Sequence, residues 1–343
     1  MAPLLELPYD IQDVSAEEDK IIKKCLLGYM KPFVKCGKNG YIMPGAFRKH
    51  AEAIYNFQVR PDDVWVISYP RSGTTWTQEM VWLIENDLDF KTAQEKPLFD
   101  RFPMLELTSQ IPEIGFQLIK SNFMNIGNFQ GLNQAARSPS WKNLEEITTP
   151  RFIKTHMPLS MLPPSLLDTA KVIYVARDPR DTLVSYYFLH KMIFRSFMRF
   201  TCKHYWDAFK RDLLPYSPII QHVNESWEQR HHKNLHIIFY EDMIADLPKV
   251  IRGVSKFLNR DLTDKQVDKL ANHLNFDKLQ KNKTVNNTTK NSEVQFIRKG
   301  KVEGWREHFD EKMELEAEEF LTTSLKGLDL KYPSFSLYEC SYL

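Results

Sequence analysis

The stretch VWVISYPRSGTTWTQEMVWLIEND, residues 64 to 87, is the part of the sequence that most clearly predicts the fold. It begins with a short apolar run rich in valine and isoleucine, which is typical of a buried parallel strand. A turn with one glycine follows, and the next residues have the spacing of an amphipathic helix. This order predicts an α/β unit in which the turn lies at the carboxyl end of a strand.

Three further runs have the same character: RFIKT at 151–155, KVIYVA at 171–176 and LHIIFY at 235–240. Each is followed by turn residues and then by a helical pattern, and the chain contains no internal repeat or low-complexity linker. We therefore predict a single α/β domain over residues 1–343, with a central parallel sheet flanked by helices and an N-terminal extension over residues 1–40. In such sheets ligands bind beyond the carboxyl ends of the strands, so the four strand-end clusters should converge.

The composition is that of a soluble globular protein, with 43% hydrophobic and 26% charged residues among 343. The net charge of +2 gives no global field that favours nucleic acid or an anionic membrane. No stretch approaches the roughly eighteen apolar residues of a membrane span, and the N-terminus has no basic flank. The four cysteines form neither a zinc nor a disulfide pattern. These features predict a cytoplasmic protein without a membrane span.

The turn after the first strand has the residue types of an anion site. Gly73 allows the backbone to approach a ligand closely, and the amides of residues 74–76 open a helix whose dipole favours an anion. Arg71 adds a cation with a fork of donors that suits phosphate oxygens. The spacing G-x-x-x-x-G-K-[ST] is absent, which disfavours a nucleoside triphosphatase of the Walker type.

Five segments resemble the cytosolic sulfotransferase family in order and spacing: YPRSGTTW, KTHMP, ARDPRDTLVSYY, FYEDM and FIRKGKVEGW. The resemblance spans roughly residues 40 to 335, and the VWLIENDL helix and FIRKGK are similar to the insect branch that includes retinol dehydratase. It implies 3′-phosphoadenosine 5′-phosphosulfate (PAPS) as the cofactor, with transfer of its sulfuryl group to a hydroxyl or an amine.

The resemblance also implies which residues hold the cofactor. Residues 71–76 would surround the 5′-phosphosulfate, a second group would grip the 3′-phosphate, and aromatic side chains would lie near the adenine. The complete set is Arg71, Ser72, Gly73, Thr74, Thr75, Trp76, Arg177, Ser185, Tyr240, Phe276, Arg298, Lys299 and Gly300.

Three side chains are the candidates for catalysis. His156 ends the strand RFIKTH, and a histidine at the carboxyl edge of a strand is a plausible proton acceptor at neutral pH; the resemblance assigns it that role. Lys154 lies on the same side of the strand and can stabilise charge in the transferring group. Arg71 stands where the family usually has lysine, so it keeps the charge but cannot donate a proton. No carboxylate cluster suggests magnesium, and we expect no metal.

The acceptor is predicted to be a small lipophilic hydroxyl compound, because large apolar side chains fall in the regions that flank the acceptor in the family. They are Phe99, Phe102, Met104, Phe116, Phe123, Met124, Phe129, Phe188, Phe194 and Phe197, of which about half are expected to be core. Residues 108–150 are longer than the corresponding stretch of vertebrate members, which suggests a lid.

Two features depart from the family pattern. Glu303 and Gly304 replace the usual Gly-Asp pair of R-K-G-x-x-G-D-W, so the turn can differ there. The family's dimer motif, which would include Arg306 and Leu315, is effectively absent, which predicts a monomer or a different dimer.

Three functions remain open from the sequence. The first is a sulfotransferase with His156 as its base. The second is net dehydration through a transient sulfate ester, as the resemblance to retinol dehydratase implies. The third is a non-catalytic binder of nucleotides or hydrophobic ligands, which retention of both Lys154 and His156 disfavours.

Overall fold

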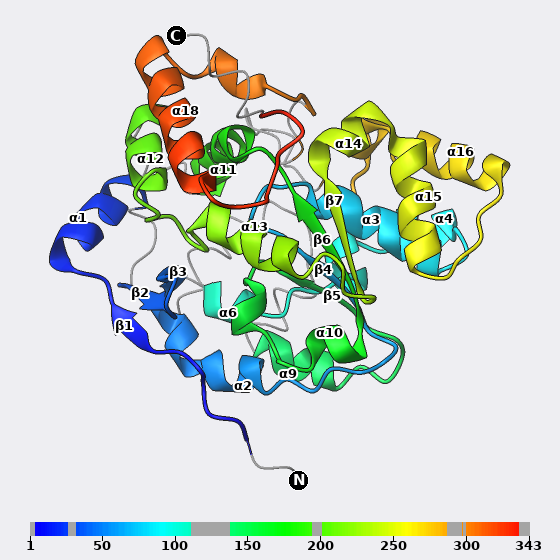
Figure 1. Cartoon of the computed structure of the whole chain (residues 1–343). Coiled ribbons are helices and arrows are strands. Elements are labelled where there is room, and N and C mark those ends of the chain that lie inside the picture. The colour runs from blue at the N-terminus through cyan, green and yellow to red at the C-terminus, as the bar shows by residue number, and fades with distance from the viewer. Residues whose placement is uncertain are drawn as a thin grey trace.

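The computed structural model describes residues 4–26, 32–110, 138–193, 201–286, 297 and 300–335. Its centre is a parallel sheet with the strand order β5-β4-β6-β7, flanked by helices (Figure 1). The strands are β4 (Val64–Ile67), β5 (Phe152–Thr155), β6 (Lys171–Ala176) and β7 (Leu235–Phe239). These are the four runs expected from the sequence, and the predicted α/β fold is confirmed.

The register of the sheet places the strand ends together. Val64 pairs with Phe152 on one side and with Lys171 on the other, and β4 keeps both neighbours in step to its last residue, Ile67. Because the strands are parallel, the segments that follow β4, β5 and β6 leave from the same edge. This edge is called the carboxyl edge below.

Side-chain alternation along β4 divides the interior into two cores. Val64 and Val66 face a core formed with helices such as α3 (Thr74–Glu85) and α15 (Leu247–Phe257), whereas Trp65 and Ile67 face the larger core on the other side. Successive residues of a strand point to opposite faces, so an apolar run without alternation is expected where both faces are covered. Figure 1 shows the two groups of helices on either side of the sheet.

The remaining elements surround this sheet. Helices lie at α1 (Ala16–Cys25), α2 (Ala51–Tyr55), α4 (Phe90–Glu95), α5 (Leu98–Arg101), α6 (Leu107–Gln110), α9 (Ser140–Glu145), α10 (Leu166–Thr169), α11 (Pro179–Ile193), α12 (Cys202–Phe209), α13 (Ile219–Glu228), α14 (Tyr240–Ala245), α16 (Asp264–His273), α17 (Phe276–Lys281) and α18 (Glu311–Leu325). Short 3₁₀ turns lie at η1 (Gly45–Lys49), η2 (Leu159–Met161) and η3 (Gly304–Glu307).

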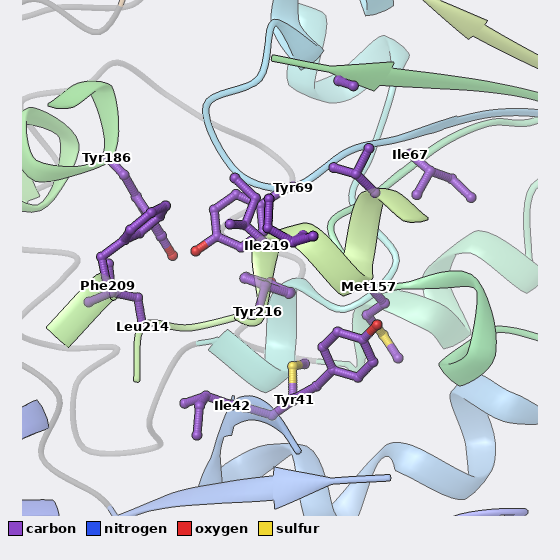
Figure 2. Packing of buried hydrophobic residues seen from close by; sticks show 14 of the residues in the cluster. Tyr41, Ile42, Ile67, Tyr69, Met157, Tyr186, Phe209, Leu214, Tyr216 and Ile219 are labelled. Atoms are coloured by element: carbon purple, nitrogen blue, oxygen red, sulfur yellow. The ribbon is translucent and has the colours of Figure 1, made fainter. Parts of the chain in front are cut away.

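A second sheet, which the sequence did not predict, joins the N-terminal part of the chain to the domain. Strands β1 (Ile11–Asp13), β2 (Phe33–Cys36) and β3 (Tyr41–Pro44) pair antiparallel in that order. Ile42 of β3 then exchanges backbone hydrogen bonds with Tyr216 and Ser217, at 2.7 and 2.9 Å. Figure 2 shows this junction, where Tyr41, Ile42, Tyr69 and Tyr216 lie in one cluster. Two strands of the predicted extension over residues 1–40 are thus part of the packed structure.

A buried ion pair holds the beginnings of β4 and β5 together. Arg151, just before β5, donates from Nε and Nη2 to the two carboxylate oxygens of Asp63, just before β4, at 2.7 and 2.6 Å. Both side chains are fully buried, and the guanidinium also donates to the carbonyl oxygen of Gln58. A bidentate pair of this geometry fixes the register of the two strands from their amino ends.

Candidate active site

The loop between β4 and α3 is suited to an anion. It ends at Gly73, the N-cap residue of α3, which has a φ of 108°. A Cβ atom at this position would lie 2.9 Å from the ring of Tyr240, so a larger residue would displace its neighbour. The first N–H groups of a helix lack partners within the helix, and the helix dipole adds partial positive charge there. The amino end of α3 therefore offers amide donors to a phosphate group.

Two arginines meet at this loop. Arg71 adopts a left-handed backbone, with φ of 73°, and its Nε donates to the hydroxyl of Ser185 over 3.1 Å. Arg177 follows β6 directly and donates from Nη1 to the carbonyl oxygen of Arg71 over 3.3 Å. Its guanidinium lies 4.1 Å from the centre of the Tyr240 ring and also donates to the carbonyl oxygen of Lys301. Segments more than a hundred residues apart in the sequence thus bring cations to one place.

His156 lies beside this loop, immediately after β5. Its Nδ1 is 2.8 Å from the carbonyl oxygen of Ser68, which can only accept, so Nδ1 carries the proton and Nε2 is the basic nitrogen. The Ser68 hydroxyl is also 2.6 Å from that of Thr74, which connects the histidine to the first residue of α3. Burial, and then the positive charge of Lys154, lower the pKa of His156 well below its ordinary value. The imidazole is therefore neutral at neutral pH and able to accept a proton.

For Lys154, two residues earlier, the effect of burial outweighs that of the neighbouring negative charge. Burial lowers the pKa of its ammonium group, the carboxylate of Glu106 acts in the opposite direction, and the charge of Arg71 also lowers it, so that the resulting pKa is about 8. The lysine is thus charged at neutral pH and loses its proton a little above it. The carboxyl edge thus carries a charged lysine, which can stabilise negative charge, and a neutral histidine, which can accept a proton.

Aromatic rings form the other wall of the site. The Trp76 ring lies edge-on to Tyr240 and to Phe276, with centroids 5.8 and 6.4 Å apart. Gly300 has a φ of 61°, and a Cβ atom there would lie only 2.4 Å from the Phe276 ring, so its backbone rests directly on that side chain. The segment that contains Gly300 therefore contacts the first residue of α17, Phe276.

The structure brings together most of the predicted site. Around the carboxyl edge lie residues 71–76, Lys154, His156, Arg177, Ser185 and Tyr240, while Phe276 adjoins Trp76 and Gly300 adjoins Phe276. Arg298 and Lys299 lie outside the described residues.

The side chains predicted to flank the acceptor lie in several different surroundings. Phe102 is fully buried against Phe152 and is part of the core beside α3, while Met104 forms a parallel bridge with Lys154. Phe188 packs on Tyr187 and His308, and Phe99 is half-buried. Phe116, Phe123, Met124, Phe129, Phe194 and Phe197 lie outside the described residues.

The ends of the predicted lid insertion, residues 108–150, are held together. Thr108 and Ser140 exchange hydrogen bonds between the backbone N–H of each and the hydroxyl of the other, at 3.2 and 2.7 Å. The hydroxyl of Ser140 also donates to the carbonyl oxygen of Leu105 over 2.6 Å. Residues 111–137, between these ends, lie outside the described residues, so the lid stays a prediction.

Sequence reasoning missed three residues that contact His156: Ser68, Glu106 and His222. Glu106 was detectable in principle, since a single acid in the apolar run PMLEL is unusual in a segment that packs against a sheet. Ser68 accepts from the imidazole through its carbonyl oxygen, and His222 donates from its side chain to the carbonyl oxygen of His156. Nothing in their local sequence indicates either contact.

The segment from Gly300 to Trp305 is attached to α11 despite its altered sequence. Asp181 accepts hydrogen bonds from the backbone N–H groups of Glu303 and Trp305, at 2.8 and 3.0 Å. Glu303 has a left-handed backbone, with φ of 57° and ψ of 21°, at the position where related sequences usually carry glycine. The replacement of the Gly-Asp pair is therefore accommodated at this turn with backbone strain.

A parallel sheet that gathers an anion site, cations and a neutral imidazole at one edge defines an α/β enzyme that handles an anionic donor. A family model for the sulfotransferase domain matches residues 61–329. Luciferin sulfotransferase of Photinus pyralis is 32% identical over 328 residues, which are 91% of this chain and 85% of that protein. The chain belongs to the sulfotransferase family.

Two solved structures of retinol dehydratase are also similar to this chain. One is in complex with androsterone and the inactive cofactor PAP, and the other with retinol and PAP. Both are 38% identical and cover 96% of this chain and 100% of their own, with TM-scores of 0.89 and 0.88. The predicted resemblance, including that to retinol dehydratase, is confirmed.

The described ranges contain neither a helix that could span a membrane nor a cluster of potential metal ligands. None of their helices combines the length and the apolar character needed to cross a bilayer. In the same ranges, no three histidine, cysteine or acidic side chains are grouped as metal ligands would be.

We expect Glu303→Gly to raise the free energy of unfolding by about 1 kcal/mol, because glycine adopts the left-handed backbone without steric cost. The lost side chain contributes little, since its contact with Arg306 spans 3.5 Å and both groups are exposed. Urea denaturation measures the change. Glu303→Ala, which removes the carboxylate but keeps Cβ, is the control, and equal stability of the two variants would contradict the strain argument.

Proposed function

We propose that this protein transfers the sulfuryl group of PAPS to the hydroxyl of a small lipophilic acceptor, with His156 as the general base. The observation that carries the proposal is the pairing of a neutral, buried His156, whose Nε2 is the basic nitrogen, with the anion site at the amino end of α3. A nucleotide binder without chemistry has no use for a base held in this way. The non-catalytic alternative is therefore the weaker one.

The side chains at the carboxyl edge fit a doubly phosphorylated donor. Ser72 Oγ, Trp76 Nε1 and Arg177 Nε are buried and have no hydrogen-bond partner among the described residues. Buried polar atoms are normally paired, so a bound phosphate ester and base would supply partners that the protein itself does not. In our proposal the loop 71–76 holds the 5′-phosphosulfate, and Arg177 and Ser185, with Arg298, Lys299 and Gly300, hold the 3′-phosphate.

The aromatic wall supports a place for the adenine. Trp76 lies next to Tyr240 and to Phe276, so the aromatic side chains that the family resemblance assigns to the adenine are neighbours. Stacking of a base on such a ring contributes on the order of 1 kcal/mol.

The mechanism assigns a separate task to each charged group. When bound, PAPS supplies a sulfuryl group attached to a phosphate that is a good leaving group. Nε2 of His156 takes the proton of the acceptor hydroxyl, while Lys154 places positive charge where negative charge develops. Arg71 acts through charge alone, since a guanidinium does not give up its proton in proteins. Positioning and charge neutralisation do most of the work in transfers of this kind.

The acceptor class is proposed from the surroundings of His156 and from the relatives. The Tyr216 ring lies 5.6 Å from the imidazole, and the adjoining cluster of Figure 2 is aromatic and aliphatic. Retinol and androsterone occupy the two retinol dehydratase structures, and the firefly relative is named for luciferin. Retinoids, steroids and phenols are accordingly the first acceptors to test. A cytoplasmic location and a monomer, or a dimer unlike the usual one, stay predictions from the sequence.

A second candidate function is net dehydration, in which the sulfated alcohol eliminates sulfate. It is favoured by the similarity to retinol dehydratase over nearly the whole chain. Both candidates share the first transfer step and the same residues. They differ in whether the sulfate ester leaves the protein intact.

We expect His156→Ala to reduce turnover by about 10² or more, because the general base is lost, while the affinity for PAP stays nearly unchanged. Initial rates with PAPS and each acceptor, together with calorimetric titration of PAP, measure the two quantities. His231→Ala, in an exposed loop, is the matched control. Full activity of the His156 variant would remove this residue from the mechanism.

Arg177→Ala should weaken PAP binding about 30-fold, which corresponds to the loss of about 2 kcal/mol from a charge-assisted contact to phosphate. Arg48→Ala, which removes an exposed arginine paired with Asp13, should leave the affinity as it is. Equal affinities for PAP in both variants would show that Arg177 does not contact the nucleotide.

Product analysis by mass spectrometry separates the two candidate functions. With retinol and PAPS, we expect a sulfated product if transfer is the complete reaction. A product that has lost water, with release of sulfate, would instead establish the dehydration. Formation of neither product from the whole acceptor panel would count against both.

A further inference from the structure

A short extended segment beside β5 approaches His156 from outside the main sheet. Lys154 donates its backbone N–H to the carbonyl oxygen of Pro103, and Leu105 donates to the carbonyl oxygen of Lys154, each at 2.9 Å. Met104 and Lys154 form a parallel bridge. In this register Glu106 lies opposite His156, because each chain advances two residues from that bridge.

The backbone ladder stops at this point, and side chains take its place. Continued pairing would have the N–H of His156 donate to the carbonyl oxygen of Leu105, but that oxygen accepts from the Ser140 hydroxyl instead. The His156 N–H donates to Oε1 of Glu106 at 2.8 Å. The carbonyl oxygen of His156 accepts from Nε2 of His222, also at 2.8 Å. Both backbone polar groups of His156 are thus held by side chains.

Glu106 is fully buried, which is costly for a carboxylate unless it has specific partners. Its Oε1 also accepts from the hydroxyl of Tyr216 at 3.1 Å. Its Oε2 is buried as well, and the hydroxyl of Thr155 favours the ionised form of this carboxyl group. The charge of Lys154 favours the ionised form of Glu106, and Arg71 is a second positive charge that acts on Lys154. A buried acid in this position compensates the charge of the lysine.

We propose that Glu106 is a positioning residue for sulfuryl transfer: it fixes the main chain of His156 and brings a buried carboxylate to the strand that carries Lys154. The inference rests on the proposed function of His156 as the base. It adds a role for a residue that touches neither the donor nor the acceptor.

The electrostatics of the site support both parts of this role. Burial alone lowers the pKa of Lys154, and Glu106 is the carboxylate that opposes this effect, leaving the value at about 8. Burial raises the pKa of Glu106, whereas hydrogen bonds from the His156 N–H and the Thr155 hydroxyl, and to a smaller extent the charge of Lys154, favour its ionised form. Removal of the carboxylate would therefore lower the pKa of Lys154, and the lysine would be neutral in a range where it is now charged.

The test is the pH–rate profile of Glu106→Gln, with retinol as an acceptor whose hydroxyl does not ionise in the range studied. Glutamine keeps an acceptor oxygen but removes the charge. We expect kcat at pH 7.5 to fall about 10-fold or more, and the alkaline limb of the profile to move to lower pH by about one unit. The KM for PAPS should change less than about 3-fold, since Glu106 accepts hydrogen bonds from His156 and Tyr216, which are not among the residues proposed to hold the nucleotide.

Glu106→Asp separates the two parts of the role. It retains the charge but shortens the side chain, so the alkaline limb should stay in place while kcat falls because the contact with the His156 N–H is lost. Glu79→Gln is the control, since Glu79 is also fully buried and paired with Arg101, away from the carboxyl edge. It should lose stability without any movement of the profile.

Several outcomes would overturn the proposal. One is a Gln variant with the parent kcat and pH profile, and another is an Asp variant whose alkaline limb moves as far as that of the Gln variant. If Glu106→Gln does not fold, as judged by circular dichroism, the Asp variant decides alone, because parent kcat there rejects the positioning role. If Glu106→Gln behaves like the parent protein and His156→Ala is inactive, only this inference is rejected. If His156→Ala is active, the proposed function is rejected.

Discussion

The parallel pairing of β4 with both β5 and β6 is the constraint on which the rest of this structure depends. Val64 pairs with Phe152 on one side and with Lys171 on the other, so three loops leave the sheet from one edge. Those loops carry Arg71, His156 and Arg177, which are distant in sequence. A shift in either register would separate the cations from the imidazole. The buried pair of Arg151 and Asp63 stabilises this register at the opposite ends of the strands.

Burial at the carboxyl edge produces the chemistry that the site offers. The same desolvation makes His156 a neutral base and lowers the pKa of Lys154 toward neutrality. Two cations near one imidazole would be unfavourable without compensation, and Glu106 supplies the opposite charge from within the protein. One of the two positive charges is therefore compensated before a donor binds. Its anion-binding loop contributes amides and a helix dipole, whose positive character does not depend on pH.

The segment from Gly300 to Trp305 differs from the family pattern in sequence but is still attached to α11. Asp181 holds the backbone N–H groups of Glu303 and Trp305, and Arg180 lies 4.5 Å from the centre of the Trp305 ring. These contacts involve backbone atoms and a ring that the altered chain retains. The cost appears as a left-handed Glu303, which is a local strain and does not displace the segment.

The sequence by itself determined the four central strands, the glycine turn before α3 and the position of Arg71, His156 and Arg177 just after strands, because periodicity and turn chemistry are local properties. The antiparallel sheet of β1, β2 and β3 and the role of Glu106 were decided only by tertiary structure. Glu106 and His222 lie 50 and 66 residues away from His156 in the sequence. Their side chains bind its backbone N–H and carbonyl groups, which every residue type except proline has. Such contacts depend on where a strand ladder stops, and that is fixed only when the segments pack together.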